Sequence, residues 1–115
     1  MAGVGTGVDS FRYEVEQSGD DQHGNKVTTI KCHGRLVIDN AGQIKEVVKP
    51  LIPLGGRIVV DLSDVNYVDS SGLGTLLALK VSAVKQGLCI LQFVNMTPRV
   101  LELLRLTGVA QTLSS

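Results

Sequence analysis

The sequence is poor in the residues that nucleic-acid recognition requires. It has no tryptophan and only two phenylalanines and two tyrosines among 115 residues. Single-stranded nucleic acids are bound largely by stacking bases on aromatic side chains, so few stacking platforms are available. The 11 basic residues are balanced by 11 acidic residues, which gives no net positive charge to attract phosphates. We therefore expect no nucleic-acid partner.

The sequence also lacks long apolar runs and paired metal ligands. No apolar run reaches the roughly 18–20 residues that a membrane-spanning helix needs, so we expect no membrane insertion. Cys32 and Cys89 both lie in strand-like runs and are interpreted as buried thiols of a reduced, cytoplasmic protein. His23 lies in a polar turn and His33 in a strand, which we place at the sheet edge, and neither has a second ligand at metal spacing. We expect no metal and no cofactor.

The remaining residues predict one α/β domain over residues 10–115, preceded by a glycine-rich, disordered segment over residues 1–9. Hydrophobic periodicity predicts strands at 11–16, 27–36, 57–62 and 88–94, and helices at 41–49, 70–86 and 98–107. Asp39-Asn40 is typical of an N-cap before the first of these helices, and Pro50 predicts that the helix ends near Lys49. The order β-β-α-β-α-β-α contains two β-α-β crossovers, which join parallel strands. We therefore predict a mixed four-stranded sheet with helices packed mainly on one face.

The central helix begins at a run of capping residues, Asp69, Ser70 and Ser71, followed by Gly72. Its apolar face is predicted from helical spacing to comprise Leu73, Leu76, Leu77, Val81 and Val84, with Gly87 as the C-cap. The first amides of a helix have no partner inside it, and the helix dipole favours negative charge there. One cap needs only one such residue, so three in a row favour a second role, that of a phosphoryl acceptor. The alternative is a plain helix cap, which contributes about 1 kcal/mol.

Other chemistries do not fit the spacing around Ser70. The glycines at 72 and 74 begin a dinucleotide-type fingerprint, but its third glycine would fall at Leu77. Ser70 is not framed as a nucleophile elbow. A hydrolase using Ser70 with His33 and an aspartate would require convergence in space that spacing does not indicate. We expect a protein without enzymatic activity.

The run Asp69-Ser-Ser-Gly-Leu-Gly74, preceded by Ile58-Val-Val-Asp-Leu62, closely resembles the signature of the STAS domain, the family of bacterial anti-sigma factor antagonists. The resemblance covers about residues 11–110. It implies that Ser70 is the serine phosphorylated by an anti-sigma factor that is also a serine kinase. Asp69 then corresponds to the acidic residue that the site requires, and Ser71 and Gly72 flank the site.

The resemblance also implies a partner-binding surface around Ser70, formed by Leu36, Val37, Ile38 and Leu73. Val37 stands where sporulation-type antagonists commonly carry an aspartate. Unphosphorylated protein would bind the anti-sigma factor, phosphorylation would release it, and a PP2C-type phosphatase would reset the switch. The alternative is that the three residues at 36–38 are ordinary core residues at a strand end.

Two further functions remain open within the same family. The chain would be a monomer or weak dimer as an antagonist, but a component of a large complex as a stressosome-type scaffold subunit. As an accessory subunit of a lipid or anion transporter, it would copurify with membrane components and its serine need not be phosphorylated.

Overall fold

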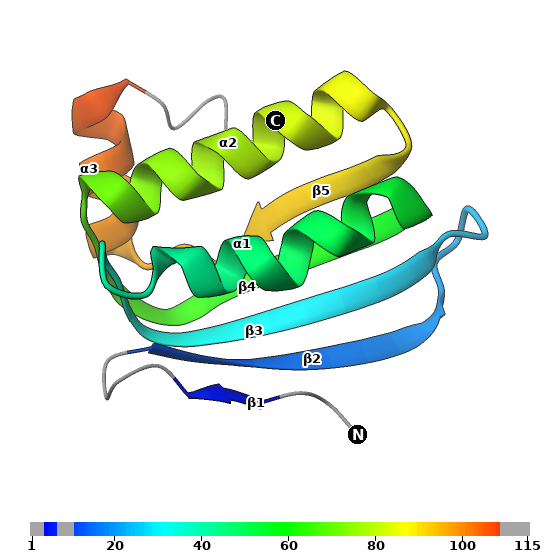
Figure 1. Cartoon of the computed structure of the whole chain (residues 1–115), viewed down its shortest axis with the longest axis horizontal. Coiled ribbons are helices and arrows are strands. Elements are labelled where there is room, and N and C mark those ends of the chain that lie inside the picture. Colours follow the sequence, from blue (N-terminus) through cyan, green and yellow to red (C-terminus); the bar gives the residue numbers. More distant parts are fainter. Residues whose placement is uncertain (1–3, 7–10, 109–115) are drawn as a thin grey trace.

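The chain forms the predicted order of strands and helices, with one short strand added in front. The computed structural model describes residues 4–6 and 11–108. Its elements are β1 (Val4–Thr6), β2 (Phe11–Asp20), β3 (Lys26–Leu36), α1 (Ala41–Val48), the 3-10 helix η1 (Lys49–Leu54), β4 (Gly56–Val68), α2 (Ser70–Gln86), β5 (Cys89–Val94) and α3 (Pro98–Thr107) (Figure 1).

The sheet is mixed, and its strands lie in the order β1-β2-β3-β4-β5. Strands β1, β2 and β3 pair antiparallel, whereas the two crossovers make β3, β4 and β5 parallel. The four predicted strands are therefore confirmed. The prediction of disorder over residues 1–9 is wrong for residues 4–6, because Val4–Thr6 pairs with β2 as a fifth, edge strand. The other residues of that segment, and residues 109–115, lie outside the described part of the chain.

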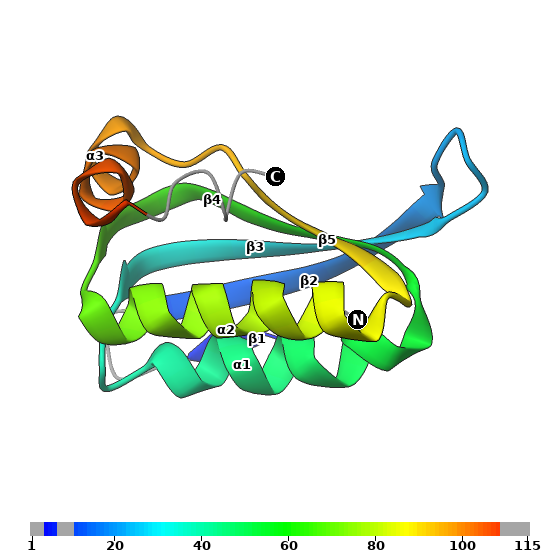
Figure 2. The same ribbon diagram turned by 90° about the horizontal axis from the view of Figure 1, so that it is seen from above.

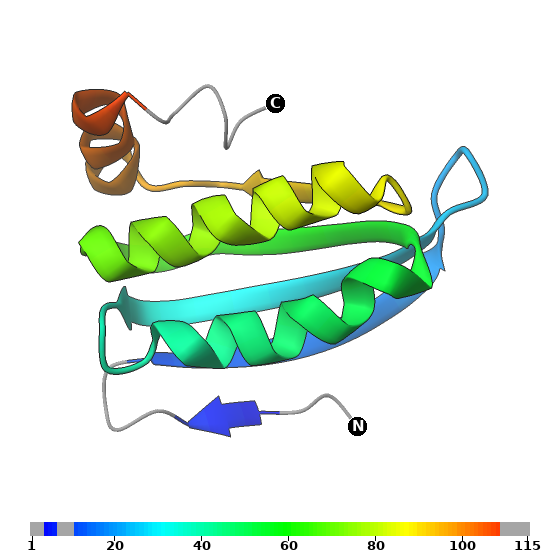
Figure 3. The same ribbon diagram turned by 45° about the horizontal axis from the view of Figure 1, so that its top comes forward.

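Two helices cover one face of the sheet and the third lies on the other (Figure 2). Helices α1 and α2 run side by side and contact each other (Figure 3), and α2 packs against β4 and β5. The prediction that helices pack mainly on one face is confirmed by this pair. Helix α3 crosses to the opposite face at the end of β4, where the Thr97 hydroxyl donates to the Val65 carbonyl at 3.2 Å. The same hydroxyl accepts from the Val100 amide and caps α3.

The helix boundaries follow the residues that predicted them. Helix α1 ends at Val48, and the chain tightens into η1 because Pro50 cannot continue the hydrogen-bond ladder. Helix α2 ends at Gly87, whose φ of 66° is the left-handed conformation of a C-cap.

The buried face of α2 differs from the predicted one. The residues that α2 buries are Gly72, Leu76, Leu79, Lys80 and Ala83. Val81 and Val84 are exposed, Val84 to 70%. The Lys80 side chain takes the inward position because its ammonium donates to the Leu91 carbonyl on β5 at 2.7 Å. Burial lowers the pKa of Lys80, and this charged hydrogen bond offsets part of the desolvation cost.

The β2–β3 hairpin projects beyond the helices (Figure 2), and Asp21 organises its turn. The Asp21 carboxylate accepts from the Asn25 amide at 2.9 Å, the Arg57 guanidinium at 2.9 Å and the His23 amide at 2.8 Å. These donors, Asn25 foremost and Arg57 next, hold the pKa of Asp21 well below its usual value of 3.8.

This lowered pKa predicts an acid-dependent loss of stability. The folded state binds the Asp21 proton less readily than the unfolded chain does. Its contribution is therefore present above about pH 3.8 and is lost as the pH falls through the folded-state pKa. Urea unfolding measured from about pH 5 to about pH 2 should show the loss, and Asp21→Asn should flatten part of it. An unchanged acid dependence in this variant would contradict the assignment.

Candidate functional site

The predicted phosphorylation site lies at the start of α2, as the sequence placed it. Asp69 is the N-cap, and its Oδ1 accepts from the Gly72 amide at 2.8 Å. The Ser70 side chain is exposed, whereas Ser71 is half-buried. No acceptor for the Ser70 or Ser71 amide is found within the described part of the chain. An anion on the Ser70 hydroxyl would therefore meet two open amides and the positive end of the helix dipole.

The same aspartate joins α2 to the loop that follows β3. Its Oδ2 accepts from the Ile38 amide at 3.0 Å, and its own amide donates to the Leu36 carbonyl at 3.1 Å. Asp69 is thus hydrogen-bonded at four atoms, because its carbonyl also accepts from the Leu73 amide, and two of these bonds reach a segment 31 to 33 residues earlier in the chain. No local sequence pattern indicates this contact, so sequence reasoning missed it.

A second residue holds the base of that loop, which we call the 37–40 loop. Asn40 is buried, and its side chain accepts from the Val37 amide at 2.9 Å and donates to the Arg35 carbonyl at 3.0 Å. Asn40 precedes α1, as predicted, but its side chain makes no cap hydrogen bond to that helix. It shapes the loop instead.

The predicted partner-binding residues differ widely in solvent exposure. Leu36 is fully buried, with 0% exposure, so its assignment to a binding surface is wrong. It is the last residue of β3 and its side chain packs in the core under the start of α2. Ile38 is 72% exposed. Val37 is half-buried, and Leu73 is half-buried against the core.

Gly72 allows α2 to approach the end of β3 this closely. A Cβ atom at Gly72 would overlap the Leu36 carbonyl oxygen. The glycine is therefore required by space rather than by backbone conformation. It keeps Asp69 and Ser70 close to the 37–40 loop.

The histidine considered as a catalytic base has other contacts. His33 lies on β3 in the middle of the sheet and not at its edge. Its Nε2 lies 2.7 Å from Glu14 Oε2 and its Nδ1 lies 2.6 Å from Asp64 Oδ2. Both ring nitrogens are thus engaged across neighbouring strands, away from Ser70. The geometry supports a hydrogen-bonded link between strands of the sheet and not a hydrolytic triad.

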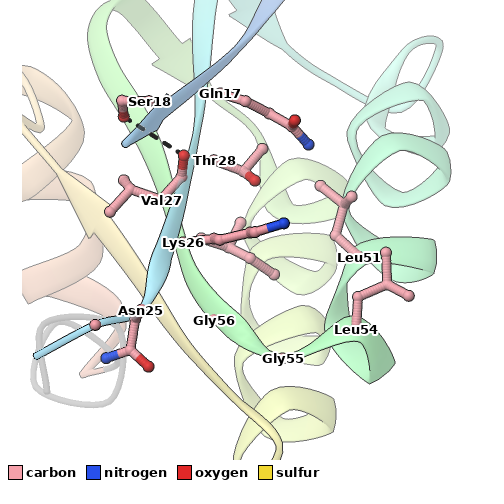
Figure 4. Close-up of a pocket in the computed structure, with 12 residues that line it drawn as sticks. Gln17, Ser18, Asn25, Lys26, Val27, Thr28, Leu51, Leu54, Gly55 and Gly56 are labelled. Carbon is pink, nitrogen blue, oxygen red and sulfur yellow. Dashed lines mark hydrogen bonds between the residues drawn. The ribbon is translucent and has the colours of Figure 1, made fainter. Parts of the chain in front are cut away.

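A pocket of about 370 Å³ (Figure 4) is lined by residues at the starts of β3 and β4, whereas Ser70 follows the end of β4. It opens between the hairpin and η1. The Lys26 side chain extends toward Leu51 and Leu54, and Gly55 and Gly56 form its floor. None of the predicted site residues lines it. The candidate site is therefore an exposed surface rather than a cavity.

Within residues 4–6 and 11–108, no cluster of three histidine, cysteine or acidic side chains could hold a metal ion. Cys32 and Cys89 are free thiols, and burial raises the pKa of Cys32 to about 12. None of the described helices is long and apolar enough to cross a membrane.

Comparison with known proteins places this chain in a family. The model of the family described as "Mlab, STAS domain" matches residues 20–114. The anti-sigma-B factor antagonist of Bacillus subtilis (strain 168) is 32% identical over 80 residues, which cover 70% of this chain and 72% of the relative.

Two solved structures share the fold at low sequence identity. An anti-sigma factor antagonist from Mycobacterium paratuberculosis superposes with a TM-score of 0.68 at 21% identity, covering 93% of this chain and 86% of the other. A sulfate transporter family protein from Wolinella succinogenes superposes with a TM-score of 0.65 at 21% identity, covering 76% of this chain and 71% of the other. The family model, the relative and the shared fold agree, and the chain belongs to the STAS domain family.

Proposed function

We propose that this protein is an anti-sigma factor antagonist whose binding to its partner is controlled by phosphorylation of Ser70. The observation that carries the proposal is the exposed Ser70 hydroxyl at the N-terminus of α2, beside the exposed Ile38. The 32% identity to the Bacillus subtilis anti-sigma-B factor antagonist supports the same function.

The exposure of the two serines favours Ser70 over Ser71 as the phosphoryl acceptor. A kinase must bring its γ-phosphate in line with the acceptor hydroxyl, which requires an accessible side chain. Ser70 is exposed, whereas Ser71 is half-buried and its carbonyl is engaged by the Thr75 hydroxyl at 3.0 Å. In this proposal the protein is a substrate and switch, and the partner supplies the kinase activity.

The proposed partner surface combines an apolar side chain with the phosphorylation site. Ile38 offers an exposed aliphatic group, and its neighbour Val37 is half-buried. Burying a side chain of this kind in a complex contributes about 1.5–3 kcal/mol. A phosphoryl group adds about −1.5 to −2 charges at pH 7, which an apolar interface can bury only at a high desolvation cost. Phosphorylation therefore releases the anti-sigma factor, and a PP2C-type phosphatase restores binding.

Phosphosite mapping tests the proposal directly. The protein is incubated with ATP and an extract of its native host, and the modified residue is located by mass spectrometry. We expect one phosphoryl group on Ser70. Ser70→Ala should remain unmodified, and Ser71→Ala should be modified as the wild type is. Phosphorylation that persists in Ser70→Ala would overturn the assignment of the site.

Binding to the anti-sigma factor separates the two states of the switch. Ser70→Ala should bind as the unmodified protein does, and Ser70→Asp should bind at least about tenfold more weakly. Isothermal titration or surface plasmon resonance with the purified factor measures both. Equal affinity of the two variants would refute phosphorylation control.

A second candidate, an accessory subunit of a transporter, is favoured by the shared fold of the Wolinella succinogenes sulfate transporter family protein. It predicts copurification with membrane components and no phosphoryl group on Ser70 in the mapping experiment.

A further inference from the structure

We propose that the Asp69 carboxylate transmits the phosphorylation state of Ser70 to the 37–40 loop. This inference rests on the proposed function, since it assigns a regulatory step to the same site. Its basis is that one side chain holds both the start of α2 and the amide of the most exposed apolar residue beside it.

The two carboxylate oxygens have separate tasks. Oδ1 accepts from the Gly72 amide within the first turn of α2, and Oδ2 accepts from the Ile38 amide across the gap between two elements. A serine or threonine cap has a single side-chain oxygen to serve both amides, whereas the Asp69 carboxylate gives one oxygen to each. Aspartate at this position therefore does more than cap the helix.

The Asp69 contact acts on the tip of the loop and not on its base. The base is held independently, because Asn40 accepts from the Val37 amide and donates to the Arg35 carbonyl. Among the described residues, Asp69 is the acceptor for the Ile38 amide. Weakening it would free the Ile38 side chain while leaving β3 and α1 in place.

Phosphorylation of the next residue would weaken this contact for two reasons. The phosphoryl group carries about −1.5 to −2 charges and repels the neighbouring carboxylate. Its oxygens are also strong acceptors, and they compete with the Asp69 carboxylate for the Gly72 and Ile38 amides. The phosphorylated protein therefore presents Ile38 on a loosened loop, which adds a conformational penalty to the electrostatic one at the partner interface.

Amide hydrogen exchange by NMR tests the coupling without any partner or kinase. Phosphoserine is introduced at position 70 by genetic encoding, and exchange is compared with the unmodified protein. We expect the Ile38 amide to exchange roughly tenfold faster in the phosphorylated form. The Val37 amide, which Asn40 holds, should be unchanged and serves as the internal control.

Two variants at position 69 separate coupling from a direct effect of the phosphate. Asp69→Ser retains a cap for Gly72 but has no second oxygen for Ile38, and Asp69→Asn has only one acceptor oxygen to share between the two amides. In Asp69→Ser, the Ile38 amide should exchange fast already, with protection kept at Gly72, and phosphoserine should add less than about twofold. In Asp69→Asn, only the amide that still donates to the single side-chain oxygen, Gly72 or Ile38, should remain protected from exchange.

Two results would overturn the inference. One is an Ile38 exchange rate that phosphoserine leaves unchanged in the wild-type background. The other is a response to phosphoserine that is equally large in Asp69→Ser. Because the phosphoserine is installed without a kinase, these results do not depend on whether the host extract modifies Ser70, and failure of the inference is distinct from failure of the proposed function.

Discussion

Replacing Gly72 with alanine is expected to lower the free energy of unfolding by about 3 kcal/mol or more. The added methyl group would overlap the Leu36 carbonyl oxygen, which belongs to the backbone and cannot turn aside as a flexible side chain can. The start of α2 must therefore move away from β3. For a domain of this size, the thermal midpoint should fall by roughly 15 °C. Urea unfolding and calorimetry measure the two quantities.

Gly74→Ala is the matched control, two residues further along the same helix. A Cβ atom there would have nothing within 4 Å. Because alanine favours the helix interior over glycine, this variant should gain about 0.5–1 kcal/mol. If both variants changed stability in the same direction and by similar amounts, helix propensity rather than the close approach at Gly72 would govern this turn.

Leu36→Ala is expected to cost about 3 kcal/mol, because the side chain is fully buried and its removal leaves a cavity. Ile38→Ala removes a side chain that is 72% exposed, and it should change the free energy of unfolding by less than about 0.5 kcal/mol. Chemical denaturation of the two variants compares them directly.

The same pair of variants separates packing from binding. Ile38→Ala should weaken binding to the anti-sigma factor while the protein stays folded, as expected for a side chain that the partner covers. A stability loss in Ile38→Ala as large as that in Leu36→Ala would show that residue 38 packs in the core, and the proposed binding surface would then lack its apolar centre.

The sequence predicted those parts of the fold that depend on local chemistry. Capping hydroxyls and carboxylates, Pro50 and Gly87 located the ends of the helices to within a residue or two, because each residue acts on the backbone next to it. The alternation of strand residues gave four of the five strands. Strand β1 escaped prediction, because it is only three residues long, lies in a glycine-rich segment and gains its order from pairing with β2.

Features that depend on contacts between distant segments could not be read from the chain. The apolar residues of α2 occupy most of its circumference, so helical spacing predicted an inward Val84, whereas the helix buries Lys80 instead. The acceptor at Leu91 that makes a buried lysine tolerable lies on another element. Likewise, three consecutive apolar residues at 36–38 gave no indication that Leu36 is buried and Ile38 exposed, because the packing of α2 against the end of β3 decides which side chain turns inward.

The order of the strands has a consequence for how the protein is made. Each strand lies beside the one that precedes it in the chain, from β1 to β5, and none is inserted between two earlier strands. The pairing of one described strand with the next therefore closes a loop no longer than one turn or one crossover, and the entropy lost on closing a loop grows with its length. During synthesis the strands therefore leave the ribosome in the same order in which they lie in the sheet. Each new strand can pair with the edge strand that was made just before it.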